Sequence, residues 1–88
     1  MSKEQAQVPN RKVFQSSNLT RGEFIPSTGA ILLEFANGSQ YLYSACGPEL
    51  WAELVAAVSP GTFFGQRIRN NPDYPVVKAR GPRQDPST

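Results

Sequence analysis

The stretch AILLEFANGSQYLYSA, residues 30–45, decides the fold of this 88-residue chain. Two runs rich in apolar and aromatic residues flank Asn37-Gly38, a pair that favours the backbone of tight hairpin turns. We therefore predict an antiparallel β-hairpin with strands over 30–36 and 39–45. The chain has the length of one domain.

The register of this hairpin determines which face Tyr41 and Tyr43 occupy, since alternate residues of a strand share a face. If residues 37–38 form a two-residue turn, both tyrosines stand on an outer face of the sheet. If residues 36–38 form a three-residue loop with a left-handed glycine, both tyrosines join Leu33 in the core. A slip of one residue exchanges the two faces, and the sequence leaves both registers open.

Two helices are expected after the hairpin. A proline at the first helical position, a glutamate in the first turn and apolar residues at helical spacing predict a helix over 48–58. Trp51 lies on its apolar face, so we expect Trp51 in the core. A second Ser-Pro pair at residues 59–60 repeats the start signal and predicts a shorter helix over 60–70.

These elements give an α+β fold: a small antiparallel β-meander of three or more strands, followed by two short helices packed on one face. We expect a flexible leader over residues 1–12, an ordered domain over 13–71 and a Pro-rich basic tail over 72–88. Within that tail, Val76 and Val77 could add an edge strand. Gly22 marks a bulge or a close approach between elements.

The composition argues against several classes of protein. The chain has one cysteine and no histidine, which excludes an internal disulfide and predicts no metal site, no cofactor and no catalytic residue. We expect Cys46 to be a small buried residue at a strand end rather than a reactive thiol. No apolar run approaches the roughly 18 residues of a membrane span, and residues 1–7 are polar. We expect a cytoplasmic protein.

Charge is distributed unevenly along the chain. Residues 1–58 carry four basic and five acidic residues, whereas residues 59–88 carry five basic and two acidic residues. A basic end is typical of proteins that contact phosphates, and also of solvated tails. Exposed tyrosines could stack on bases while the cations contact phosphates. The candidate nucleic-acid-binding residues are Tyr41, Tyr43, Arg67, Arg69, Lys78 and Arg80.

Several short motifs occur in a recognisable order between residues 13 and 74. They are Ser16-Ser17-Asn18-Leu19, Leu33-Glu34-Phe35, Tyr41-Leu42-Tyr43, Pro48 with Trp51, Ser59 with Gly61, Phe63-Phe64 and Ile68-Arg69. This order resembles the KTSC domain, a module at the C-terminus of some lysyl-tRNA synthetases that also forms stand-alone bacterial and phage proteins. Phe24 departs from the pattern, because the family usually has a tyrosine there.

The resemblance implies RNA binding without catalysis. From the residues, two further functions stay open. The chain could be a protein-interaction or self-assembly module, because a small sheet leaves strand edges to be covered by a partner or a second copy. It could also be an oligomeric binder of a small nucleotide-like ligand, since the same aromatic and arginine side chains would suit one.

Overall fold

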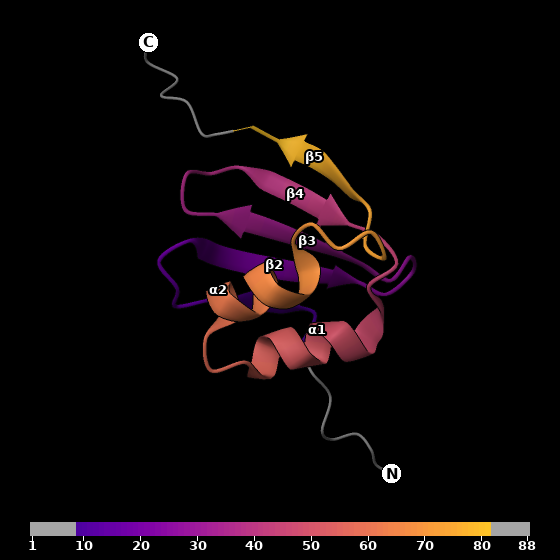
Figure 1. Cartoon of the computed structure of the whole chain (residues 1–88), viewed down its shortest axis with the longest axis horizontal. Helices are drawn as coiled ribbons and strands as arrows, with labels where there is room; N and C mark the ends of the chain where they lie inside the picture. Colours follow the sequence, from indigo (N-terminus) through magenta and orange to yellow (C-terminus); the bar gives the residue numbers. More distant parts are fainter. Residues whose placement is uncertain (1–8, 82–88) are drawn as a thin grey trace.

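The computed structural model describes residues 9–81 as a five-stranded antiparallel sheet with helices on one face (Figure 1). The strands follow one another in space as they do in sequence, so the sheet is a meander and the predicted α+β fold is confirmed. The elements are β1 (Arg11–Val13), β2 (Leu19–Ile25), β3 (Ala30–Phe35), β4 (Gln40–Tyr43), α1 (Gly47–Ala56), α2 (Pro60–Phe63), the π-helix η1 (Phe64–Ile68) and β5 (Val76–Arg80).

The predicted hairpin joins β3 to β4 through a three-residue loop. The N–H of Phe35 donates a hydrogen bond to the carbonyl oxygen of Ser39 at 2.9 Å, and the N–H of Gly38 donates to the carbonyl oxygen of Phe35 at 2.8 Å. Gly38 has a φ of +92°, a left-handed conformation that glycine adopts without a Cβ clash. Of the two registers left open by the sequence, the structure has the one that turns the tyrosines toward the core.

Trp51 of α1 packs at the centre of the core, as predicted. It is 2% exposed, stacks near Phe24 at 6.3 Å between ring centres and meets Phe14 edge-on at 6.4 Å. Its indole N–H donates to the carbonyl oxygen of Pro9 at 2.8 Å, so the buried polar atom of this ring is satisfied. The turn before α1 is held to the sheet because the N–H groups of Cys46 and Gly47 both donate hydrogen bonds to the carbonyl oxygen of Gly29.

The sheet extends beyond the predicted domain of residues 13–71 on both sides. β1 begins at Arg11, within the segment expected as a leader, and pairs with β2. β5 lies within the segment expected as a tail, and it includes the edge strand suggested for Val76 and Val77. Residues 1–8 and 82–88, which belong to the same leader and tail, lie outside the described residues.

The second predicted helix, over residues 60–70, has two parts of different winding. α2 forms one turn and continues directly into η1, which ends as the N–H of Arg69 donates to the carbonyl oxygen of Phe64 at 2.9 Å. This bond spans five residues, so the helix is wider there than an α-helix. Between residues 9 and 81, no helix has both the length and the apolar character needed to cross a membrane.

Gly22 is the close approach suggested by the sequence. A Cβ at this position of β2 would lie 2.9 Å from Leu33 Cδ2, 3.1 Å from Phe14 Cε2 and 3.2 Å from Trp51 Cζ3. All three atoms belong to buried side chains of the core. The absence of a side chain at Gly22 therefore lets Trp51 approach the middle of the sheet.

Replacing Gly22 by alanine is expected to lower the free energy of unfolding by about 1–3 kcal/mol, because overpacking forces core side chains from their preferred positions. Urea denaturation measures this change. Gly65→Ala is the matched control, since a Cβ there has no neighbour within 4 Å and alanine favours helix by up to about 1 kcal/mol. Equal stability of the Gly22→Ala variant and the original chain would contradict this packing.

Candidate functional site

A groove opens on the helix-covered face of the sheet, beside η1 and toward β4 and β5. In Figure 1, α1 and α2 lie on the β2 side of the sheet, away from β4 and β5, and the segment after η1 crosses to β5 near the end of β4. The groove has a volume of about 620 Å³, within the range of ligand pockets. Its walls combine aromatic rings, prolines, amides and one arginine: Asn18, Phe35, Tyr41, Tyr43, Phe64, Arg69, Asn70, Asn71, Pro72, Tyr74, Pro75 and Val76.

Four aromatic rings form the floor of this groove in a chain of edge-to-face contacts. The ring centres of Tyr41 and Phe35 are 5.6 Å apart, those of Phe35 and Phe64 5.3 Å, and those of Phe64 and Tyr43 5.5 Å. Tyr43 is buried, whereas Tyr41 and Phe35 are partly exposed. The rings are therefore held in place by one another, and Tyr41 is the member of the tyrosine pair with ring surface open to solvent.

The outer wall is the segment from Arg69 to Pro75, which is fixed by hydrogen bonds. The side chain of Asn71 donates to the carbonyl oxygen of Arg67 and accepts from the N–H of Asp73, each at 2.9 Å. The N–H of Ser44 at the end of β4 donates to the carbonyl oxygen of Pro75 at 2.8 Å. These bonds tie the wall to both η1 and the sheet, so the groove is preformed.

The candidate residues predicted from sequence separate into two groups. Tyr41, Tyr43 and Arg69 line the groove together, and the strand register places Lys78 opposite Tyr41 on the same side of the sheet. Arg67 is directed elsewhere, because its guanidinium forms an ion pair with Glu53 at 3.1 Å and lies over the ring of Phe63.

Arg80 is the other candidate that lies away from the groove. It pairs with Gln40 across the β4–β5 register shift, and its charge lowers the pKa of Glu34 on the uncovered face. The shift between Gln40 and Tyr41 places Arg80 and Lys78 on opposite sides of the sheet.

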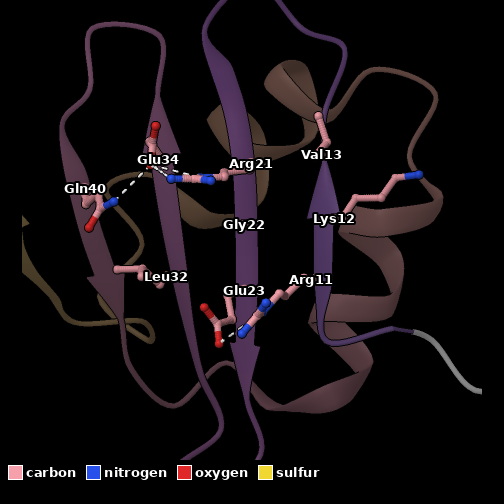
Figure 2. Close-up of a pocket in the computed structure, with 9 residues that line it drawn as sticks. All are labelled: Arg11, Lys12, Val13, Arg21, Gly22, Glu23, Leu32, Glu34 and Gln40. Atoms are coloured by element: carbon pink, nitrogen blue, oxygen red, sulfur yellow. Dashed lines mark hydrogen bonds and ion pairs between the residues drawn. The ribbon is translucent and has the colours of Figure 1, made fainter. Parts of the chain in front are cut away.

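The uncovered face carries a second, smaller pocket of about 320 Å³ with a buried carboxylate (Figure 2). Glu34 is only 5% exposed. Its Oε1 atom accepts hydrogen bonds from Gln40 Nε2 at 2.9 Å and Arg21 Nε at 3.0 Å. On the edge of the same pocket, Arg11 Nε lies 3.8 Å from Glu23 Oε2. This face therefore presents charges of both signs in close pairs.

A protein-family model described as the KTSC domain matches residues 15–74. The chain belongs to the KTSC domain family. The match includes the aromatic floor of the groove and ends at Tyr74, so the two edge strands β1 and β5 lie outside it. A search of curated proteins gives no match.

In this KTSC domain the single cysteine is buried, as predicted. Burial raises the pKa of the Cys46 thiol to about 11, and its Sγ atom lies 3.3 Å from the carbonyl oxygen of Tyr43. A thiol that stays protonated at neutral pH is a weak nucleophile. Within residues 9–81, no group of three or more potential metal-ligating His, Cys, Asp or Glu side chains occurs.

Three further aromatic residues of this KTSC domain line the groove but were not predicted as site residues from the sequence: Phe35, Phe64 and Tyr74. Phe35 and Phe64 are indistinguishable from core positions in the sequence, and both do pack against the core. Tyr74 could have been recognised from the sequence as a candidate, because it is a lone aromatic residue between two prolines in a polar segment. In the structure Tyr74 is partly buried, packs against the core and lines the groove.

The network around Glu34 predicts a pH dependence of stability. Hydrogen bonding from Gln40, opposed by burial and aided by Arg21, lowers the pKa of Glu34. The folded state therefore gains stability from the charged carboxylate above the unfolded pKa of about 4.3, and loses it as pH falls through the lower folded pKa. Urea denaturation at neutral pH and near pH 3 measures this loss. The Glu34→Gln variant is expected to lose less stability between neutral pH and pH 3. An equal loss in the variant and the original chain would contradict the role given to the Glu34 carboxylate.

Proposed function

We propose that this KTSC domain is a non-catalytic binding module for single-stranded nucleic acid, with RNA as the ligand, and that it acts in the cytoplasm. The ligand would enter the groove between β4 and the segment over residues 69–75. The partly exposed rings of Tyr41 and Tyr74 would contact bases, and Arg69 with Lys78 would contact phosphates. Base-aromatic contact combined with phosphate-cation contact is how single strands are bound without a need for sequence readout.

One observation carries this proposal: the groove brings aromatic surface together with Arg69, and Lys78 lies opposite Tyr41 on the same side of the sheet. Among the described residues that line the groove, none is Asp or Glu. Neither Arg69 nor Lys78 forms an ion pair with another residue in the described range 9–81. The charge of these two side chains is therefore available to a ligand.

The pocket on the uncovered face supports the proposal less well. It also has arginines, but Arg21 is engaged by Glu34 at 2.9 Å and Arg11 lies near Glu23. A phosphate that binds these arginines would lie close to the carboxylates of Glu34 and Glu23, which repel it. The groove thus has the more favourable electrostatics for a polyanion.

The exposed edge of β5 favours a second candidate function, protein interaction. All five residues of this strand are exposed, and Val76 and Val77 are 48% and 59% exposed. An open strand edge can pair with a strand of another chain. Lys78 and Arg80 oppose pairing with a second copy of the same edge, because like charges would meet, so an extended acidic segment would be the better partner.

Replacing Arg69 by glutamine is expected to weaken binding to a labelled single-stranded RNA oligonucleotide. Loss of one phosphate contact should also reduce the slope of log affinity against log salt by about 0.7 for a single strand. Fluorescence anisotropy titrations at several salt concentrations measure both quantities.

Arg11→Gln provides the matched control for this experiment. It makes the same chemical change at an exposed arginine on the opposite edge strand, outside the groove. We expect Arg11→Gln to leave the salt slope unchanged. Equal effects of the two substitutions would show that only general charge matters, and absence of RNA binding at low salt would refute the proposed function.

A further inference from the structure

The hydroxyl group of Tyr43 has no hydrogen-bond partner among the residues that the structure describes. The residue is 6% exposed, yet within the part of the chain that the structure describes its hydroxyl forms no hydrogen bond. By contrast, the buried indole N–H of Trp51 has a partner at 2.8 Å. A buried phenol hydroxyl usually has a hydrogen-bond partner. An unsatisfied one in the wall of a groove points to a ligand atom as its partner.

A cation acts on this hydroxyl from within the groove. Arg69 lines the same groove, and its charge acts on the Tyr43 phenol. Burial nevertheless raises the pKa of Tyr43, with a further contribution from Tyr41, so the phenol stays protonated and able to donate at neutral pH. Tyr41 supplies a second hydroxyl from the same side of β4.

The side chains of Tyr43 and Arg69 indicate which chemical group would bind in this part of the groove. A ligand atom has to accept a hydrogen bond from a phenol and carry negative charge toward a guanidinium. The walls beside it are aromatic rings and prolines, which suit an attached planar group. A phosphate joined to a nucleoside meets both requirements.

We infer that the Tyr43 hydroxyl and the Arg69 guanidinium together bind one phosphate group, with its nucleoside against the aromatic floor. This inference rests on the proposed function, because that function identifies the molecule to which the phosphate belongs. The phosphate belongs to a phosphodiester if a nucleic acid strand is the ligand, and to a free nucleotide otherwise. The Tyr-x-Tyr motif then provides a donor to the ligand as well as core packing.

Tyr43→Phe tests the inference, because it removes the hydroxyl and keeps the ring that packs on Phe64. Since the hydroxyl has no partner within residues 9–81, thermal stability should be unchanged or slightly raised. Affinity for single-stranded RNA should fall by about tenfold, as for loss of a hydrogen bond to a charged group. The salt slope should stay the same, since no charge is removed. Ser27→Ala is the control, since it removes an exposed hydroxyl outside the groove, and it should leave affinity within about twofold.

Inorganic phosphate and adenosine monophosphate serve as separate probes in nuclear magnetic resonance titrations. Both should shift the Arg69 side-chain Nε–H signal in the original chain, and much less in Tyr43→Phe. Acetate at the same ionic strength should have little effect. Equal shifts with acetate, or equal shifts in the variant, would overturn the phosphate assignment.

The outcomes separate this inference from the proposed function. RNA binding that is equally tight in Tyr43→Phe would overturn the phosphate site and leave the nucleic-acid proposal standing. No RNA binding, with Tyr43-dependent binding of adenosine monophosphate, would refute the nucleic-acid proposal and support the phosphate site with a free nucleotide as its source. No response to any phosphate-bearing probe would overturn both.

Discussion

The left-handed backbone of Gly38 is the constraint on which the rest of this structure depends. It closes a three-residue loop between β3 and β4 and thereby sets their register, with Ile31 opposite Tyr43 and Leu33 opposite Tyr41. Because side chains alternate along a strand, this single choice assigns every residue of the hairpin to a face. It sends the aromatic residues toward the helices and leaves Glu34 on the uncovered side.

The two faces consequently have different chemistry. On the uncovered face, Glu34 is enclosed by Arg21 and Gln40, so charges of opposite sign neutralise one another. On the covered face, the helices stop short of β4 and β5, and the segment after η1 forms a wall instead (Figure 1). A groove lined by aromatic rings and Arg69 results there, which is the basis for proposing a phosphate-bearing ligand.

Local signals predicted the hairpin, both helices and the central position of Trp51, because turn residues, prolines and apolar spacing act within a few neighbouring residues. The face of the tyrosines could not be predicted, since Asn37-Gly38 is compatible with loops of two or three residues. The sequence also could not show that Arg69 and Lys78 lie on the groove side while Arg67 and Arg80 lie away from the groove. This separation depends on a pairing partner for Arg67 and on a register shift in β5, both of which are long-range features.

The most direct test of this account is a nuclear Overhauser measurement on the tyrosine ring protons. We expect cross-peaks from Tyr43 to Phe64 and from Tyr41 to Phe35, whose ring centres lie 5.5 and 5.6 Å apart. Cross-peaks from either tyrosine ring to the side chains of Leu32 or Arg21 would instead place the tyrosines on the uncovered face. That result would contradict the register, and the groove with its phosphate site would be lost with it.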